Sequence, residues 1–255
     1  VTKTYNIIAG EMTVTGDDYN APYDGQPHSV TATPSVTTGT TVEYSTDNTN
    51  WFETAPTWTE VTDGAQLVYI RATNPNYNTA TATATVNITK TAATIASIPN
   101  QTYTGSAIEP TLTVTGINNT PLVKGTDYNV SFSNNINVGT ATATITWLNG
   151  NYGSPTSVTF QIVKANFSVS GTSYNAAYDG NTHGVAAVPS VTTGTTVYYS
   201  TDGGSTWNTT VPTIKDVGSK SVSVRAVNPN YEDATCTYTL TVTQKSVTVK
   251  ADDKT

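Results

Sequence analysis

The chain has 255 residues, of which only 11% are charged, and its formal net charge at pH 7 is −7. This composition lacks the clustered Lys and Arg that binding to nucleic acid or to an anionic membrane surface requires. A single cysteine excludes an internal disulfide framework and a Cys-rich metal site. No apolar run approaches the roughly 20 residues of a membrane-spanning helix.

The chain contains 55 threonines. A β-branched side chain fits the pleat of a strand, and its hydroxyl suits the face that meets water. This composition predicts an all-β protein.

The opening residues, 1–9, resemble the end of a later segment. Tyr5, Ile7 and Ile8 align with Phe160, Ile162 and Val163. We therefore expect residues 1–9 to be the last strand of an upstream module. By the same reasoning, residues 246–255 are expected to be the first strand of a following module.

Matched motifs then recur in the first and last thirds of the chain. They are YNAPYDG at 19–25 with YNAAYDG at 174–180, PSVTTGTTV at 34–42 and 189–197, and VYIRATNPNY at 68–77 with VSVRAVNPNY at 222–231. Between these copies, YTG at 103–105 and NGNY at 149–152 take the places of YDG and NPNY. The pattern predicts three related modules, named here repeat 1 (residues 10–90), repeat 2 (91–165) and repeat 3 (166–245).

Each repeat reads as short strands separated by turns. In repeat 1 we expect strands at 28–36, 41–47, 67–73 and 79–89, of about seven in all. The last of these alternates between Ala, Val or Ile and Thr, and the matching segment of repeat 3 does the same. A period of two places one face of the strand in a core and the other in water. The prediction is an Ig-like antiparallel β-sandwich for each repeat.

Repeats 1 and 3 resemble the YDG-type Ig-like domains of bacterial cell-surface proteins, on their YDG and NPNY motifs. Repeat 2, with YTGSAIEPTLTV and GNYGSPTSVTFQI, is similar to the related MBG-type repeat of Gram-positive surface proteins. The resemblance covers nearly the whole chain. It implies three tandem sandwiches in an elongated rod at the bacterial cell surface or cell wall, with no catalytic residue and no cofactor.

The stretch STDGGSTW at 200–207 has the pattern of an Asp-box, a turn found in sialidases, and STDNTNW at 45–51 is a shorter copy. A sialidase needs several Arg for the sialic carboxylate, but this chain has only Arg71 and Arg225, which occupy equivalent positions in separate repeats. The boxes are therefore interpreted as structural turns. Their residues are Asp47, Trp51, Asp202, Gly204 and Trp207.

Other polar groups have structural interpretations too. Arg71 and Arg225 are expected to pair with an acid such as Asp24 or Asp179. His28 and His183 follow the YDG motifs in separate repeats and lack the partners that a metal site or a triad needs. The tyrosines of the YDG and YTG motifs are expected to close the sandwich edges. They are Tyr23, Tyr103 and Tyr178.

Cys236 stands where repeat 1 has Ala82, on the inward face of a last strand, so a buried, protonated thiol is expected. Three acidic pairs could bind calcium near the junctions, although solvated surface charge is the favoured interpretation. They are Asp17–Asp18, Glu232–Asp233 and Asp252–Asp253.

Two functions fit these observations. The first is a non-catalytic, monomeric, extracellular stalk or adhesive segment that spaces and presents other domains, with a host or microbial glycan or a surface protein as partner. The second is a set of carbohydrate-binding modules. Sugar binding needs exposed aromatic rings. Trp51 and Trp207 belong to the Asp-box turns, so the candidates for glycan contact are Phe52, Trp58 and Trp147.

Overall fold

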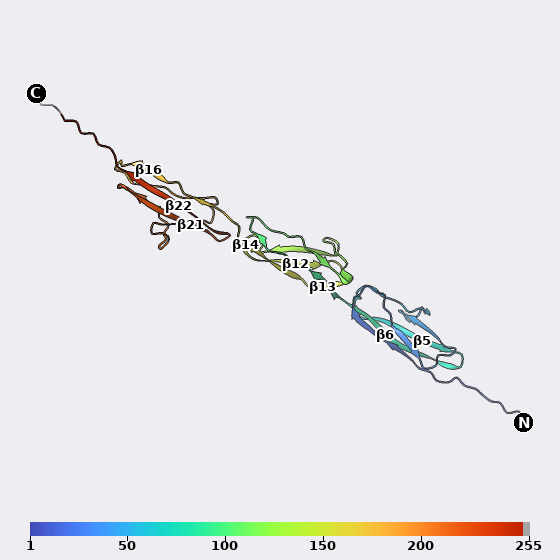
Figure 1. The fold of residues 1–255 in the computed structure, drawn as a ribbon. Coiled ribbons are helices and arrows are strands. Elements are labelled where there is room, and N and C mark those ends of the chain that lie inside the picture. The colour runs from blue at the N-terminus through green and yellow to red at the C-terminus, as the bar shows by residue number, and fades with distance from the viewer. Residues whose placement is uncertain (252–255) are drawn as a thin grey trace. The chain divides into compact units, whose positions relative to one another are not determined.

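The computed structural model describes residues 1–251, and their regular secondary structure consists of β-strands apart from one 3₁₀ turn (Figure 1). The strands of repeat 1 are β1 (Val14–Asp17), β2 (Tyr19–Pro22), β3 (Thr31–Pro34), β4 (Thr41–Ser45), β5 (Gln66–Asn74) and β6 (Tyr77–Thr89). Those of repeat 2 are β7 (Thr91–Ala92), β8 (Thr94–Ile95), β9 (Gln101–Thr102), β10 (Val114–Thr115), β11 (Tyr128–Ser133), β12 (Gly139–Trp147), β13 (Tyr152–Ser154) and β14 (Ser157–Val163), with one 3₁₀ turn, η1 (Ile117–Asn119). Those of repeat 3 are β15 (Val169–Ser170), β16 (Tyr174–Ala177), β17 (His183–Gly184), β18 (Val188–Pro189), β19 (Thr196–Ser200), β20 (Thr213–Ile214), β21 (Gly218–Asn228) and β22 (Tyr231–Thr243).

The chain divides into two compact units. One holds Val1–Ile98, Thr111–Ser131 and Ala143–Val158, and the other holds Pro99–Pro110, Phe132–Thr142 and Thr159–Thr255. The first unit contains all of repeat 1 and the second contains all of repeat 3, while repeat 2 contributes to both.

Repeats 1 and 3 have the same sheet topology. The four-stranded sheet of repeat 1 has the order β2-β6-β5-β4, and that of repeat 3 has the order β16-β22-β21-β19. Smaller sheets, β1-β3 in repeat 1 and β15-β18 in repeat 3, pack against these four-stranded sheets. The four-stranded sheet of repeat 2 has the order β11-β12-β14-β9. The all-β, Ig-like sandwich prediction is confirmed. Repeat 1 has six strands and not about seven: the four strands predicted by range correspond to β3–β6, and β1 and β2 precede them.

The predicted alternation of the last strands is confirmed. Along β6, Ala80, Ala84, Val86 and Ile88 are buried while Thr81, Thr83 and Thr89 are exposed. Along β22, Ala234, Tyr238, Leu240 and Val242 are buried, and the intervening threonines are exposed or half-buried. The long hairpins β5–β6 and β21–β22 carry these buried faces, and repeats 1 and 3 each have an apolar core.

The YDG and YTG tyrosines are anchored alike in all three repeats. The strand before each of them, β2, β9 or β16, pairs in parallel with the last strand of its repeat. The tyrosine amide then donates to a carbonyl at the end of that last strand. These bonds are Tyr23 N–Thr89 O at 2.8 Å, Tyr103 N–Val163 O at 2.9 Å and Tyr178 N–Thr243 O at 2.9 Å. The motif therefore occupies the same end of each sandwich.

Residues 1–9 and 246–251 form no strand. Tyr5, Ile7 and Ile8, which were aligned with a buried strand, are 84%, 95% and 80% exposed. The assignment of residues 1–9 and 246–255 to neighbouring modules stays a prediction.

Candidate functional site

The Asp-box of repeat 3 is a turn organised around one carboxylate. Asp202 Oδ1 accepts hydrogen bonds from Ser200 Oγ at 2.6 Å and from the Thr206 amide at 3.0 Å, and its Oδ2 accepts one from Thr206 Oγ1 at 2.6 Å. Gly203 and Gly204 have φ of 74° and 95°, a region that glycine enters without steric cost. Trp207 packs against Gly204.

The Asp-box of repeat 1 forms an equivalent turn with one residue fewer. Asp47 Oδ1 accepts from the amides of Thr49 and Asn50, both at 2.8 Å, and Asn48 supplies the positive φ, 59°. Each turn is closed by a pair of backbone bonds, Tyr44 with Phe52 in repeat 1 and Tyr199 with Asn208 in repeat 3.

Hydrogen bonding lowers the pKa of both turn carboxyls below the ordinary value. For Asp202 the largest contribution comes from the Ser200 hydroxyl, and for Asp47 from the Asn50 amide. These bonds are made to the ionised form, so they stabilise the folded turn when the carboxylate is charged. That stabilisation is complete above the unfolded pKa, about 3.9, and is lost as the pH falls toward the lower folded value.

We expect Asp202→Ala to destabilise repeat 3 at neutral pH, because the turn amide and hydroxyls lose their acceptor. The difference from the parent should shrink as the pH falls below about 4. Calorimetry across that pH range measures both effects, with Asp233→Ala as an exposed control. Neither protein should hydrolyse a fluorogenic sialoside. Parent turnover that disappears in Asp202→Ala would make the box catalytic and overturn the turn interpretation.

The expected partners of the two arginines were wrong. Arg71 lies opposite Glu43 across β4 and β5, and its Nε and Nη2 donate to Glu43 Oε2 at 3.0 and 2.8 Å. In repeat 3 the residue opposite Arg225 is Tyr198, so no carboxylate replaces Glu43 there. Both guanidinium groups instead share a feature, since they lie over the Asp-box rings of Trp51 and Trp207 at 4.4 and 5.3 Å.

The acids proposed for those arginines pair with histidines. His28 Nε2 donates to Asp24 Oδ1 at 2.8 Å, and His183 Nε2 donates to Asp179 Oδ1 at 2.9 Å. The bond from His183 is the largest cause of the lowered pKa of Asp179. Each imidazole also stacks on the ring of a tyrosine nine residues earlier, Tyr19 for His28 and Tyr174 for His183. The pairs therefore close the YDG turns.

The three glycan candidates do not form a joint platform. The Trp147 ring contacts Tyr128 and Tyr152, and its Nε1 donates to Pro155 O at 3.2 Å. Trp58 is half-buried and bridges to His28 through its backbone, while Phe52 is 64% exposed. Among the described residues, no aromatic contact joins any two of these three rings.

The remaining candidates are placed on strands and turns. Cys236 is half-buried beside the core of repeat 3, and burial raises the pKa of its thiol. Asp17 and Asp18 accept hydrogen bonds from Thr31 Oγ1 and from the Thr85 amide. Within residues 1–251 no three His, Cys, Asp or Glu side chains gather as a metal site would require. The pair Asp252–Asp253 lies outside the described residues.

The Asn-x-Asn-Tyr motif, which marked the three repeats in the sequence, forms an extended polar site. Its first Asn ties the turn to its own repeat. Asn74 Nδ2 donates to Thr38 O and Thr40 Oγ1, both at 2.9 Å, and Asn228 makes the same two bonds with Thr193 and Thr195. The Oδ1 of each first Asn accepts from the amide of the second Asn at 3.0 Å. The turn is thus rigid without help from a neighbouring repeat.

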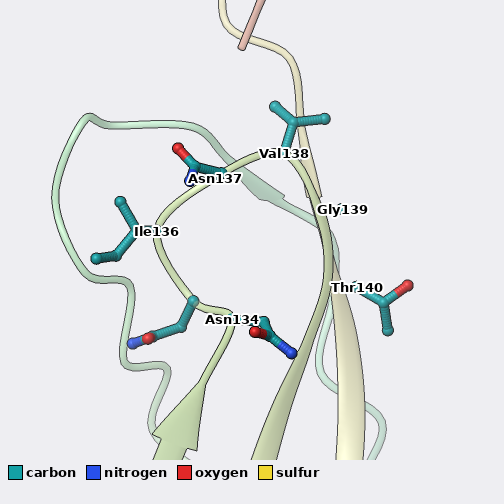
Figure 2. A pocket seen from close by; sticks show the side chains of 7 residues that line it. Asn134, Ile136, Asn137, Val138, Gly139 and Thr140 are labelled. Carbon is teal, nitrogen blue, oxygen red and sulfur yellow. The ribbon is translucent and has the colours of Figure 1, made fainter. Parts of the chain in front are cut away.

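The second Asn of the motif bonds to the preceding repeat. Within the first compact unit, Asn151 Oδ1 accepts from the Val61 amide at 3.0 Å, and its Nδ2 donates to Glu60. Within the second unit, Asn230 Oδ1 accepts from the Val138 amide at 3.0 Å, and its Nδ2 donates to Asn137 Oδ1 at 3.1 Å. Figure 2 shows Asn137 and Val138 in the loop of residues 134–140, which encloses a shallow pocket. The two sites use equivalent atoms.

The tyrosines of the YDG and YTG turns also make contacts beyond their own repeats. Tyr23 packs against the core of repeat 1, and its ring meets Tyr152 edge to face at 6.0 Å. Tyr103 likewise meets Tyr231 at 5.3 Å. The tyrosine of a YDG or YTG turn therefore packs against the tyrosine of the next repeat's Asn-x-Asn-Tyr turn. Tyr178 has no such ring contact among the described residues and is 37% exposed.

The linkers complete both junctions with backbone bonds. Thr91 N donates to Asn151 O at 2.9 Å, and Ala165 N donates to Asn230 O at 3.1 Å. The Glu232 amide also returns a bond to Ala165 O at 2.8 Å. The asparagine and tyrosine contacts thus join repeat 1 to repeat 2 and repeat 2 to repeat 3, while the linker bonds hold each linker to the repeat that follows it. The sequence signal for them was the presence of two Asn and a Tyr at fixed spacing in all three repeats.

No protein-family model matches the chain, and no curated protein matches it. Among solved structures, it is similar to a tetra-tandem repeat in the extending region of a large adhesion protein, at 17% identity and a TM-score of 0.34, covering 92% of this chain and 74% of that one. The three N-terminal domains of the highly immunogenic outer capsid protein of bacteriophage RB49 give 13% and 0.33, covering 93% and 100%. An I-band fragment of titin gives 11% and 0.33, covering 91% and 97%.

The strand order and cores of the repeats define the class of protein. Residues 1–251 form an all-β chain of three tandem Ig-like β-sandwiches. In this part of the chain, no helix has the length and apolar character needed to cross a membrane.

Proposed function

We propose that the chain is a non-catalytic stalk segment of a large bacterial surface protein, which spaces and presents other domains. The observation that carries this proposal is the repeated junction. Equivalent asparagine and tyrosine contacts join the repeats at both junctions, and equivalent linker bonds accompany them. A chain that keeps the same inter-repeat contacts from one junction to the next suits a spacer better than a set of independent binding modules.

The contacts also support limited bending at each junction. A flexible linker would leave neighbouring modules free to reorient, as is the default for domains with small interfaces. Here the linker itself is hydrogen-bonded to the following repeat, and Asn151 is 94% buried where it bonds to the preceding one. Opening a junction would exchange these hydrogen bonds for bonds to water, so each bond contributes about 0.5–1.5 kcal/mol to holding the junction closed.

The cellular location, the monomeric state and the partner in this proposal rest on the sequence. The resemblance of the YDG and NPNY motifs to bacterial surface modules supports an extracellular place at the cell surface or in the cell wall. The low charge and single cysteine agree with a monomeric segment that binds no nucleic acid and inserts in no membrane. A host or microbial glycan or a surface protein would be the partner of the longer protein.

Small-angle X-ray scattering tests the stalk. A single compact globule of 255 residues would have a radius of gyration of about 18 Å by the usual size scaling. We expect a clearly larger radius, because three tandem sandwiches joined by short linkers should extend. A measured value near 18 Å would reject the proposal.

Two further measurements separate the stalk from the glycan-binding alternative. Antibodies against the chain should label intact cells of the source organism. A glycan array should show no binding that depends on Phe52, Trp58 or Trp147. Binding that Trp58→Ala or Trp147→Ala abolishes, while the repeats stay folded, would favour carbohydrate-binding modules instead.

A further inference from the structure

Each repeat carries an acceptor surface at the end where its YDG or YTG turn lies. We name this surface the pole and define it by three residues: the turn tyrosine, a valine, and the polar residue before that valine. The poles are Tyr23, Glu60 and Val61 in repeat 1, Tyr103, Asn137 and Val138 in repeat 2, and Tyr178, Asp216 and Val217 in repeat 3.

In repeats 1 and 2 the pole holds the next repeat's Asn-x-Asn-Tyr turn. The valine amide donates to the second Asn, the polar residue accepts from the same side chain, and the two tyrosine rings meet edge to face. One asparagine amide can make both bonds because it offers an acceptor oxygen and two donor hydrogens side by side.

The pole of repeat 3 is built in the same way. The Tyr178 amide is anchored to Thr243 O just as Tyr23 and Tyr103 are anchored in their repeats. In repeats 2 and 3 a glycine with positive φ follows the valine, with φ of 140° at Gly139 and 154° at Gly218. Asp216 precedes Val217 as Glu60 and Asn137 precede Val61 and Val138, and its carboxylate can accept a hydrogen bond as their side-chain oxygens do. Repeat 3 therefore carries the same residue types at the same positions as the two occupied poles.

This third pole is exposed. Val61 and Val138 are half-buried, whereas Val217 is 51% exposed. Tyr23 and Tyr103 are half-buried, whereas Tyr178 is exposed. Among residues 1–251, no group accepts a hydrogen bond from the Val217 amide. Repeat 1 carries an Asn-x-Asn-Tyr turn of the kind that the other two poles bind. Its second Asn, Asn76, is exposed, whereas the equivalent Asn151 of repeat 2 is 94% buried.

We propose that the pole of repeat 3 is a docking surface for the Asn-x-Asn-Tyr turn of another Ig-like module of this type. The partner's second Asn bonds to the Val217 amide and to Asp216, and its Tyr packs on Tyr178. The inference rests on the proposed stalk function, because it extends the two junctions of this chain to a third. We choose this partner because the same turn occupies the equivalent poles of repeats 1 and 2.

The test replaces residues 244–255 with a second copy of residues 164–243, joined directly after Thr243. The appended copy brings its own linker, Asn230 and Tyr231 to the pole of repeat 3. Amide hydrogen exchange, resolved by residue with NMR, reports whether the Val217 amide becomes bonded. We expect its exchange to slow by at least about tenfold relative to the parent, because a bonded amide exchanges only when the junction opens.

The matched control is Asn230→Ala in the appended copy alone. Asn228 still holds that turn to its own repeat, so the copy stays folded, as unchanged protection of its Val222 amide would show. In this control the Val217 amide should exchange at the parent rate. Equal Val217 exchange in the parent and the extended protein would overturn the inference.

The amides of Val61 and Val138 separate this inference from the proposed function. In the parent both should be protected, and Asn230→Ala should release Val138 alone. Free exchange of both amides in the parent would reject the junctions, and with them the stalk. If the Val61 and Val138 amides are protected but the Val217 amide of the extended protein is not, only the proposed docking surface on repeat 3 is rejected.

Discussion

Leu240→Ala is expected to lower the free energy of unfolding of repeat 3 by about 2–5 kcal/mol, the range for truncating a large buried side chain to Ala. Leu240 is completely buried on β22, within the core cluster that also contains Val222 and Val224. The substitution removes apolar atoms that are buried on folding, and it leaves a cavity that the surrounding side chains fill only in part.

Differential scanning calorimetry of the full chain measures this effect. The control is Thr235→Ala, because Thr235 lies on the outward face of the same strand and is exposed. Its effect should stay within about 0.5 kcal/mol. Repeat 1 has a separate core, so its transition should not move. Equal effects of the two substitutions would contradict the assignment of the inward face.

Gly171→Ala is expected to destabilise repeat 3 by about 1–3 kcal/mol, the usual cost of overpacking a core. A Cβ at this position would overlap the Cδ1 and ring of Tyr238. That ring cannot move freely, because it is 97% buried and its hydroxyl donates to Val185 O at 2.5 Å. Burial also raises the pKa of Tyr238 to about 12.

Gly150→Ala is the matched control, since nothing lies within 4 Å of a Cβ built there. Chemical unfolding of both variants should give a loss for Gly171→Ala only. Combining Gly171→Ala with Tyr238→Leu tests the cause, because a smaller side chain removes the overlap. The two substitutions should then cost less together than the sum of their separate effects. Strict additivity would show that the clash is not the reason.

The sequence by itself determined the class of fold and the repeat pattern. Alternation along β6 and β22 fixes which face is buried, because successive side chains of a strand point to opposite sides. The Asp-box positions could also be read locally, since Asp47 and Asp202 act on amides within four residues of themselves. Such features depend on neighbours in the chain, which a linear pattern records directly.

Only the tertiary structure decided which distant groups meet. Arg71 pairs with Glu43 because the register of β4 on β5 places them opposite each other, and no motif encodes that register. The second Asn of the Asn-x-Asn-Tyr motif bonds to a loop about 90 residues away, so its role depends on how one repeat meets the next. A hydrogen bond needs donor and acceptor within about 3 Å, and only the folded chain brings Asn151 to Val61 and Asn230 to Val138.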